Sequence, residues 1–503
     1  MVFDREDDGV MKYLVTAEEM RRYDTNTIEK IGIPALVLME RAALAAMEAV
    51  ERHCSGEIGP ALVLAGMGNN GGDGLALARL LCEQGFQVEI WCVGAQERAS
   101  VQWKQQRKIL DSYPVEMVTK PGRREYTVVI DALFGVGLSR EIDGAFQEAV
   151  KSFDVLSGYK IALDLPSGVD SDTGRIWGCA IHADETVTFG FCKRGLVMYP
   201  GCEYAGKVTV AQIGISERSF FSDKPGMVLC DEAAEALLPS RRADGNKGTF
   251  GKVLLVAGSR NMAGAAVLAA KAAYRIGAGM VKVITPEENR VIVQETVPEA
   301  LLGGHSDMES SLEWSDVIAL GPGIGKSGEA VRCLEQVLKK SRKPLILDAD
   351  GLNLLSESPV LRAHMAEQGK EGRIFVLTPH VGELARLTGR SIAELKEDLP
   401  VHGMTLACEL HAIVAAKDAR TFVCGEDFPV CVSLSGNSGM AVAGSGDVLT
   451  GAIAGLLAQG MTPFQATVSG VRLHGLAGDR VSDRLGEHAC MAGDIADALG
   501  QEW

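Results

Sequence analysis

Short apolar segments alternate with longer helix-like stretches along most of the chain. Before residue 215 the apolar runs occupy residues 61–65, 88–93, 128–130 and 161–163. After residue 245 they recur at residues 253–257, 281–284, 317–320, 345–347, 375–377, 413–416 and 421–423. Between them lie predicted helices, for example at residues 75–83 and 264–276. Strands that alternate with helices predict parallel sheets covered by helices, so the expected fold class is α/β.

The alternation is interrupted between residues 215 and 245. This segment contains Pro225, Gly226, Pro239 and the polar run at residues 240–245, a composition typical of boundaries between domains. A chain of 503 residues is long enough for two or more domains with cores of their own. We therefore expect two three-layer α/β/α domains, at residues 1–220 and 225–503.

Composition narrows the possible partners. The net charge of −16 argues against nucleic acid, whose phosphates bind to basic surfaces. No apolar run approaches the ~20 residues that span a bilayer. The acidic residues 1–8 form no apolar leader, and the scattered cysteines form no C-x-x-C pair. We therefore expect no membrane contact, a cytoplasmic location and reduced thiols.

The first glycine-rich loop, at residues 66–74, follows a predicted strand and matches G-x-G-x-x-G. With Glu89 about twenty residues further on, this pattern is the dinucleotide-binding fingerprint, and an NAD-dependent dehydrogenase is one interpretation. Against it, Asn69, Asn70 and Asp73 crowd the loop with polar groups. The chain also offers no clear hydride-transfer partner.

Further polar residues follow the apolar strands of the first half. Asp131, Asp164 and Ser167 each come directly or soon after such a strand. Either aspartate alone could be a helix N-cap. Because ligands bind beyond the carboxyl ends of parallel strands, these residues and Asn70 could instead converge at one edge of the sheet. Such oxygens suit a hard cation or an acid–base site.

The second glycine-rich loop, at residues 444–447, precedes another helix-like stretch. Unpaired N–H groups at a helix start attract phosphate, and the adjacent Asp447 could take a proton from a hydroxyl. Phosphoryl transfer needs both features. A competing P-loop at residues 321–327 fails because Leu320 stands where a glycine is required.

The two halves of this chain each resemble a known protein family. Residues 14–215 resemble the YjeF N-terminal family of NAD(P)H-hydrate epimerases, which implies a Rossmann-like domain. Residues 245–500 resemble the ribokinase-like NAD(P)H-hydrate dehydratases. The first resemblance rests on residues 69–74 (NNGGDG), 131–138 (DALFGVGL), 164–170 (DLPSGVD) and 189–195 (FGFCKRG). The second rests on residues 247–252 (KGTFGK), 264–266 (GAA), 321–323 (GPG), 378–383 (TPHVGE) and 444–451 (GSGDVLTG).

The epimerase resemblance implies substrate, cation and catalytic residues in the first half. The hydrated dinucleotide would be held by Asn69, Asn70, Gly71, Gly72, Asp73, Gly135, Val136, Gly137, Leu138, Ser139, Arg140 and Glu141. Potassium would be bound by Asn70, Asp131 and Ser167. Asp164 would contact the hydrated ring and shuttle a proton, with Lys193 as a second candidate for that role.

The dehydratase resemblance implies two ligand sets in the second half. The substrate site would be lined by Ala265, Gly323, His380 and the catalytic Asp447. The adenine nucleotide would be held by Lys417, Asp418, Ala419, Arg420, Thr421 and Gly446. Asp418 departs from the family pattern, which has glycine at this position, and an added carboxylate near phosphate is unfavourable unless it faces solvent.

Together the resemblances imply repair of hydrated NADH and NADPH (NADHX and NADPHX) by one homo-oligomeric enzyme. The first half would interconvert the R and S epimers at C6 of the nicotinamide ring. The second would dehydrate the S epimer after phosphorylation of its C6 hydroxyl, with ADP or ATP as donor and magnesium as the metal. A non-catalytic nucleotide sensor is the alternative from another class.

Overall fold

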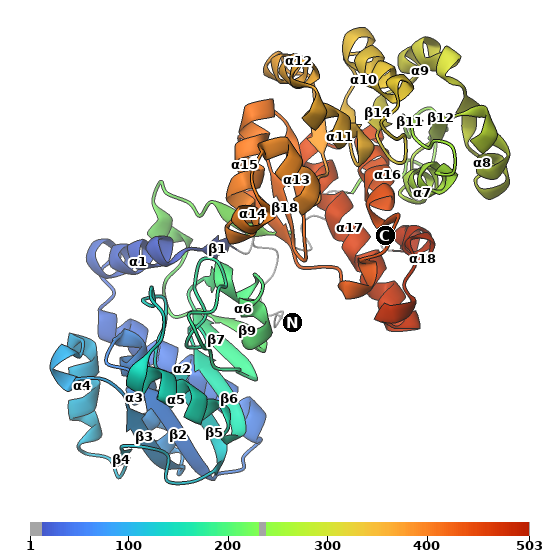
Figure 1. Ribbon diagram of the computed structural model, residues 1–503. Helices are drawn as coiled ribbons and strands as arrows, with labels where there is room; N and C mark the ends of the chain where they lie inside the picture. Colours follow the sequence, from blue (N-terminus) through green and yellow to red (C-terminus); the bar gives the residue numbers. More distant parts are fainter. Residues whose placement is uncertain (1–12, 231–237, 502–503) are drawn as a thin grey trace. The chain divides into compact units, whose positions relative to one another are not determined.

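The computed structural model describes residues 13–230 and 238–501, and the chain divides into two compact units, Met1–Gly226 and Met227–Trp503. Each unit contains its own largely parallel sheet with helices packed around it (Figure 1). The predicted α/β fold class, with two such domains, is confirmed.

The first unit is built on a seven-stranded sheet in the order β4-β3-β2-β5-β6-β7-β9, in which every pairing is parallel. Its strands are β2 (Pro60–Ala65), β3 (Gln87–Cys92), β4 (Glu116–Val118), β5 (Glu125–Ala132), β6 (Ser157–Leu163), β7 (Glu185–Phe189) and β9 (Lys207–Ala211), and β1 (Tyr13–Val15) pairs separately with β8 (Cys192–Lys193). Its helices are α1 (Ala17–Thr25), α2 (Ala35–Cys54), α3 (Asn69–Glu83), α4 (Val101–Leu110), α5 (Gly144–Asp154) and α6 (Gly201–Tyr204).

Alternate residues of the central strands supply two separate apolar cores. Val63 and Ile130 pack in the core that contains residues of α2, α3 and α4. Leu62 and Val129 pack in a second core, which contains Phe153 of α5. Because successive side chains of a strand point to opposite faces, both faces of this sheet are buried, which gives the three layers of a doubly wound domain.

The second unit contains strands in the order β13-β12-β11-β14-β15-β16-β17-β18-β19-β10, parallel except where β18 pairs with β17 and β19. The strands are β10 (Met227–Leu229), β11 (Lys252–Val256), β12 (Met280–Ile284), β13 (Leu301–Gly303), β14 (Val317–Leu320), β15 (Leu345–Leu347), β16 (Phe375–Leu377), β17 (Ile413–Lys417), β18 (Thr421–Cys424) and β19 (Val430–Ser433). The helices are α7 (Ala263–Arg275), α8 (Arg290–Thr296), α9 (Met308–Trp314), α10 (Gly328–Lys340), α11 (Asp350–Glu357), α12 (Pro359–Lys370), α13 (Val381–Thr388), α14 (Ile392–Glu397), α15 (Leu399–Leu410), α16 (Ser445–Ala458), α17 (Pro463–Leu485) and α18 (Ala492–Ala498).

One local expectation was wrong. The helix predicted at residues 75–83 begins at Asn69, so much of the first glycine-rich loop is helical. Gly71 allows this start, because a Cβ there would lie 1.9 Å from the carbonyl oxygen of Gly66. Cys230, which directly follows β10, lies beside Cys431 of β19, with 5.6 Å between their Cα atoms.

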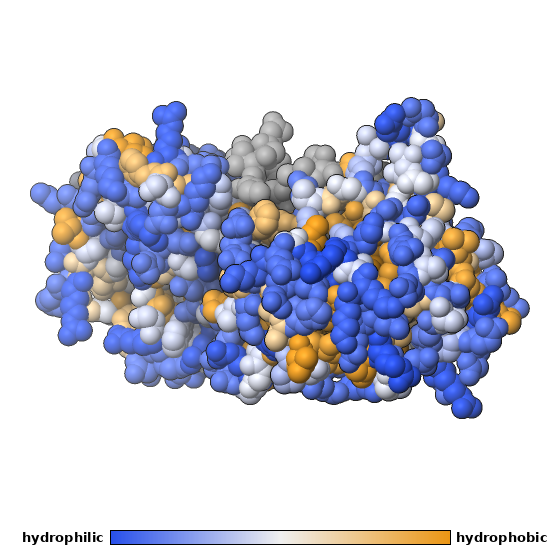
Figure 2. Space-filling model, turned by 90° about the horizontal axis from the view of Figure 1, so that it is seen from above, coloured by the Kyte–Doolittle hydropathy of each residue, from blue (hydrophilic) through white to orange (hydrophobic). Residues whose placement is uncertain are grey.

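The visible surface in Figure 2 is mostly hydrophilic, with apolar residues in small groups. Within the described residues, no helix has the length and apolar character needed to cross a bilayer.

Two candidate active sites

The first site lies where β2, β5 and β6 end. In the pairing register Ala65 faces Ala132, and Asp131 faces Ala162, so the carboxyl ends of the three strands lie side by side. Asp164 comes directly after β6, and α3 begins with Asn69 after β2. The topology therefore brings together the polar residues that the sequence placed at strand ends.

Asp131 and Ser167 form a buried hydrogen-bonded pair at this edge. The Ser167 amide donates to Asp131 Oδ2 at 2.7 Å, and the Ser167 hydroxyl donates to Asp131 Oδ1 at 2.6 Å. Burial raises the pKa of Asp131 to about 6, although these donors oppose the shift. The pair also contacts the backbone of Phe134, whose amide donates to Ser167 Oγ at 2.9 Å.

Asn70 completes this cluster and leaves one oxygen without a partner. Its Nδ2 donates to the carbonyl oxygen of Phe134 at 2.9 Å. Its Oδ1 is buried and accepts no hydrogen bond from any residue that the structure describes. A buried acceptor without a partner is costly, and this side chain shares its contact with the Phe134 backbone with Ser167, the partner of Asp131. The three residues predicted to bind a cation thus meet around Phe134.

Asp164 is held in a constrained conformation by a buried lysine. Its φ is +68°, in the left-handed region that residues other than glycine rarely adopt. Lys193 Nζ lies 2.5 Å from Asp164 Oδ1. The same ammonium donates to Thr188 Oγ1 at 3.0 Å and to the Phe189 carbonyl oxygen at 2.8 Å. Those three contacts use all the donors of a lysine.

Two further carboxylates belong to the charge cluster around Asp164. Burial, followed by the negative charges of Asp164 and Asp24, raises the pKa of Asp73 well above its usual range. Burial and the charge of Asp164 likewise raise the pKa of Asp24, while Lys193 opposes both shifts. The sequence did not indicate Asp24, which lies in α1 far from any motif.

The remaining residues expected to hold the dinucleotide lie at the start of α3 and on the loop at residues 135–141. Gly135 faces the site, because a Cβ there would lie 3.1 Å from Asp164 Oδ2. Gly137, Ser139, Arg140 and Glu141 are exposed, whereas Val136 and Leu138 are partly buried. The loop is tied down at both ends: Val136 accepts a hydrogen bond from Arg21, and Glu141 pairs with Arg175.

The dehydrogenase interpretation fails at Glu89. This residue lies within β3, not beyond its end, and is buried. Its carboxylate accepts hydrogen bonds from the Tyr126 hydroxyl at 2.7 Å, the Gly122 amide at 3.0 Å and Arg123 Nε at 3.2 Å. A ribose would have no free oxygen to bind.

The second site surrounds the beginning of α16. Gly444 caps this helix with φ +94°, and a Cβ there would lie 2.4 Å from Leu268 of α7. A Cβ on Gly446 would lie 3.2 Å from Lys417 Nζ and 3.6 Å from Asp348 Oδ2. The first turn of α16 therefore lies beside the carboxyl ends of β15 and β17, where it presents unpaired N–H groups next to a lysine.

Asp447 is the third residue of α16 and is partly buried. Burial, followed by the negative charge of Asp348, raises the pKa of Asp447 to about 7, and Lys417 opposes the shift. Within residues 13–230 and 238–501, no hydrogen bond or ion pair engages its carboxylate. The group is therefore free to exchange a proton near neutral pH.

Ala265 and Gly323 lie against each other at the edge of this site. Gly323 has φ +62°, and a Cβ there would lie 2.8 Å from Ala265 Cβ. His380 caps α13 with its ring, since Nδ1 accepts from the Gly382 amide at 2.9 Å. Burial and the positive charge of Lys417 lower the pKa of His380, so a neutral imidazole lines the site.

Most of the residues predicted to bind the nucleotide, residues 417–421, connect β17 to β18 in a tight turn, and Gly446 lies in α16. Lys417 Nζ lies 3.2 Å from Asp348 Oδ1. Asp418 is exposed, and its carboxylate lies 3.7 Å from Lys396 Nζ. Arg420 donates to the carbonyl oxygen of Leu434 at 3.0 Å. Asp418 thus faces solvent and Lys396. The positive charge of this lysine offsets the negative charge that Asp418 adds where the family has glycine.

Sequence reasoning missed several residues of this site. Thr450 donates to Asp348 Oδ2 at 2.8 Å, so Asp348 orients both Lys417 and α16. His474, buried in the middle of α17, lies 3.2 Å from Ser445 Oγ through its Nε2. Burial lowers the pKa of His474 to about 4. Asp348 directly follows a predicted strand, which was an available signal, whereas no motif marks His474.

Two parallel-sheet domains, each with a carboxylate at a glycine-rich helix start, define a two-site enzyme of the nucleotide-handling α/β class. The chain belongs to the family of bifunctional NAD(P)H-hydrate repair enzymes. Its residues 35–195 match the YjeF-related protein N-terminus, and residues 253–500 match the NAD(P)H-hydrate dehydratase family. The resemblances found in the sequence are thereby confirmed.

Relatives match both halves in one alignment. The bifunctional NAD(P)H-hydrate repair enzyme Nnr of Moorella thermoacetica is 36% identical, over 97% of this chain and 96% of that protein. The Escherichia coli enzyme of the same name is 31% identical, over 96% of this chain and 92% of that protein. Among solved structures, the Bacillus subtilis ADP/ATP-dependent NAD(P)H-hydrate dehydratase is 30% identical, covers 54% of this chain and 96% of its own, and gives a TM-score of 0.48.

Proposed function

We propose that the N-terminal unit interconverts the R and S epimers of hydrated NADH and NADPH, and that the C-terminal unit dehydrates the S epimer after phosphorylation of its C6 hydroxyl. The observation that carries this assignment is the environment of Asp447. Its carboxylate has no partner among the described residues, its pKa is raised to about 7, and it stands at a helix start beside Lys417. Full-length relatives named as bifunctional repair enzymes support both activities.

Dehydration needs a better leaving group than hydroxide. Asp447 takes the proton of the C6 hydroxyl while that oxygen bonds to the terminal phosphorus of ADP or ATP and the donor's bridging P–O bond breaks. The N–H groups of Gly444 and Gly446 bind the transferred phosphoryl oxygens, whereas the Ser445 N–H already donates to the Val442 carbonyl oxygen at 3.3 Å. The ring nitrogen then expels phosphate as the C6–O bond breaks, and loss of a proton from C5 restores the dihydronicotinamide.

We infer that the donor and its metal bind on the Lys417 side of the site. The ammonium of Lys417 lies between Asp348 and the first turn of α16, where it can bind phosphate. No group of three or more Asp, Glu, His or Cys side chains suited to a metal occurs in the described part of the chain. This fits magnesium, which binds chiefly to phosphates and water. It would neutralise the charge of the donor.

Epimerisation requires C6 to open and close again. Asp164 takes the C6 hydroxyl proton as the C6–N1 bond breaks and delivers a proton to N1, which gives an aldehyde and an enamine. Closure on the opposite face of the aldehyde reverses these steps and gives the other epimer. Lys193 is the weaker candidate for the proton shuttle, because its donors already engage Asp164, Thr188 and Phe189. We assign it the positioning of Asp164.

Potassium fits the cluster beside Asp164. The unpartnered Asn70 Oδ1 and the oxygens of Asp131 and Ser167 are the neutral and anionic ligands that hard cations prefer. The ion would bind the oxygens of the opening ring or hold the loop at residue 134. We expect exchange of potassium for tetramethylammonium, or Asn70→Ala, to slow epimerisation and to abolish potassium-dependent thermal stabilisation. Dehydration of the S epimer should not respond to either change.

The decisive assay supplies the full-length protein with a mixture of both epimers of hydrated NADH, with ADP, ATP or neither. We expect complete recovery of NADH with a nucleotide and none without it. Recovery that stops when one epimer is exhausted would remove the epimerase assignment. No recovery with either nucleotide would contradict the dehydratase assignment. We also propose residues 1–220 and 225–503 as the two catalytic domains, which the division of the chain into two compact units supports.

A further inference from the structure

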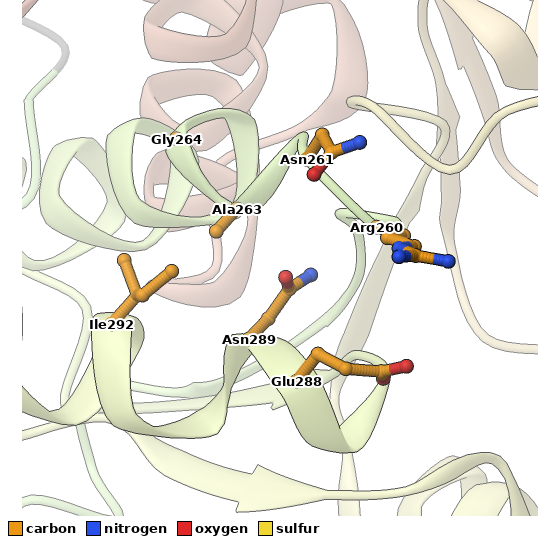
Figure 3. A pocket seen from close by; sticks show the side chains of 7 residues that line it. All are labelled: Arg260, Asn261, Ala263, Gly264, Glu288, Asn289 and Ile292. Atoms are coloured by element: carbon orange, nitrogen blue, oxygen red, sulfur yellow. The ribbon is translucent and has the colours of Figure 1, made fainter.

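A cavity of about 420 Å³ opens beside the start of α7 in the second unit. It lies between the loop that follows β11 and the segment that joins β12 to α8 (Figure 3). The residues that line it are Arg260, Asn261, Ala263, Gly264, Glu288, Asn289 and Ile292. The proposed mechanism uses none of them, although Gly264 belongs to the GAA motif at residues 264–266.

Asn289 places one unpartnered acceptor in the cavity. The side chain is only 2% exposed. Its Nδ2 donates to the Ser259 carbonyl oxygen at 3.1 Å and to Thr285 Oγ1 at 2.9 Å. These two bonds fix the amide orientation and leave Oδ1 without a hydrogen bond to any described residue. Figure 3 shows the amide pointing into the cavity, toward Ala263. A ligand with an N–H donor would satisfy this oxygen.

The part of the cavity between Ala263 and the half-exposed Ile292 is suited to a flat, largely apolar group. Ala263 and Ile292 face each other across it (Figure 3). Gly264 adds open space, because a Cβ there would meet no atom within 4 Å. Cavities lined by small apolar groups with one fixed polar atom are typical of sites for a base or other small ring. The exocyclic amine of adenine is the donor that Asn289 Oδ1 would accept.

The rim of the cavity carries charge of both signs. Arg260 and Glu288 lie on the same side of it in Figure 3, and both are exposed. Neither forms an ion pair with another described residue. In dinucleotide sites a carboxylate binds ribose hydroxyls and an arginine binds the 2′-phosphate of NADP. The rim therefore suits the ribose of an adenosine whose base lies deeper in the cavity.

A row of contacts along α7 leads from the cavity toward the dehydratase site. A Cβ on Gly323 would contact Ala265 and lie 3.2 Å from the Met262 carbonyl oxygen. One turn further along α7, Leu268 reaches Gly444 at the start of α16. The residues on this path run from the cavity rim toward Asp447. Lys417, where the phosphoryl donor is placed, lies on the other side of α16, beyond β14, β15 and β16 in the sheet order.

We propose that this cavity binds the adenosine half of the hydrated dinucleotide while its nicotinamide half lies at Asp447, and that Arg260 recognises the 2′-phosphate of hydrated NADPH. The inference rests on the proposed dehydratase function, which it extends to substrate recognition. Asn289 Oδ1 accepts from the adenine amine, Ala263 and Ile292 sandwich the base, and Glu288 binds the ribose.

The test blocks the cavity without touching the reacting centre. Ile292→Trp fills it, whereas Val291→Trp is the matched control, because Val291 is the neighbour of Ile292 on α8, is exposed as Ile292 is, and does not line the cavity. Each full-length variant is assayed with hydrated NADH and with hydrated nicotinamide mononucleotide, which lacks the adenosine. We expect Ile292→Trp to raise KM for hydrated NADH about tenfold or more, the effect of losing a few interactions. The mononucleotide should react as in the wild type.

Arg260 is tested by comparing the two natural substrates. Arg260→Gln should raise KM about tenfold for hydrated NADPH and leave hydrated NADH nearly unchanged, and Arg260→Lys should recover part of the loss. Equal KM values for Ile292→Trp and Val291→Trp would overturn the inference, as would a change in KM for ADP or ATP alone. Failure of the wild-type protein to dehydrate either substrate would instead contradict the proposed function itself.

Discussion

The two active sites of this chain use their central carboxylates in opposite ways. Asp164 is fixed by Lys193 at 2.5 Å and by a left-handed backbone. Asp447 has no such partner, and burial beside Asp348 raises its pKa to about 7. A carboxylate held by an ammonium is precisely oriented, whereas an unpaired one with a raised pKa is ready to accept a proton at neutral pH.

This difference matches the two reactions. Epimerisation moves one proton between two atoms of the same ring, so the position of the group matters most. Phosphoryl transfer requires a base that ionises at the working pH and a set of N–H groups for the transferred charge. Similar folds and similar glycine-rich helix starts thus support different chemistry, because the charges around each carboxylate differ.

The largest effect is expected for Asp447→Asn. The amide cannot accept the C6 hydroxyl proton, so dehydration of S-epimer hydrated NADH should fall by about 10²–10⁴-fold. Epimerisation should persist, as followed by chromatographic exchange of the epimers. Asp483→Asn, an exposed position on α17, is the control and should leave both rates unchanged. Near-normal dehydration by folded Asp447→Asn would remove this residue from the mechanism.

Asp164→Asn should have the opposite effect, with epimerisation lost and dehydration kept. Epimer exchange should slow by about 10²-fold or more, since a positioned proton shuttle is lost, and dehydration of the S epimer should be unaffected. Lys193→Met should in addition lower the unfolding free energy, because it leaves the Asp164 carboxylate buried without its partner. Thermal unfolding measures this loss. Unchanged epimer exchange in Asp164→Asn would transfer the catalytic role to Asp73 or Lys193.

The raised pKa of Asp447 predicts how dehydration depends on pH. The base must be ionised, so kcat for the S epimer should rise with pH and level off above about 7.

The contribution of Asp447 to the free energy of unfolding should change with pH in the opposite direction. Since the folded pKa exceeds the ordinary 3.8, the contribution of this group is complete below that value and is lost as pH rises through about 7. Relative to Asp447→Asn, the wild type should therefore lose unfolding free energy between pH 4 and 7; parallel curves would contradict the shift.

The smallest effect is expected at Asp418. The side chain is exposed and pairs with Lys396 at 3.7 Å, and surface ion pairs contribute little. Asp418→Gly, which restores the family residue, should change KM for ADP or ATP by less than about threefold. Steady-state kinetics with varied nucleotide measure it. A tenfold or larger gain in affinity would show that this carboxylate faces the bound phosphates.

The sequence predicted the first site better than the second. Asp131, Asp164 and Ser167 could be placed together because strand ends of a parallel sheet share one edge. The start of α3 was missed because Gly71, Gly72 and Gly74 disfavour helix in isolation, and the close approach of Gly71 to Gly66 is visible only in three dimensions.

The contacts of other features could not be predicted from the sequence. His474 reaches the second site because α17 packs against α16. No local sequence pattern predicts this packing. The partnership of Asp164 with Lys193 depends on a distance across the fold. The cavity beside α7 combines residues from two loops, and its main clue, the unpaired Oδ1 of Asn289, follows from what its Nδ2 contacts.

The most direct test of two independent sites mixes Asp164→Asn and Asp447→Asn, each of which should lack one of the two activities. Each receives both epimers of hydrated NADH with ADP or ATP, alone and together. Asp164→Asn alone should stop when the S epimer is exhausted, and Asp447→Asn alone should produce no NADH. The mixture should convert all of the substrate, because the released epimer diffuses from one protein to the other. A mixture that repairs no more than Asp164→Asn alone would contradict this account.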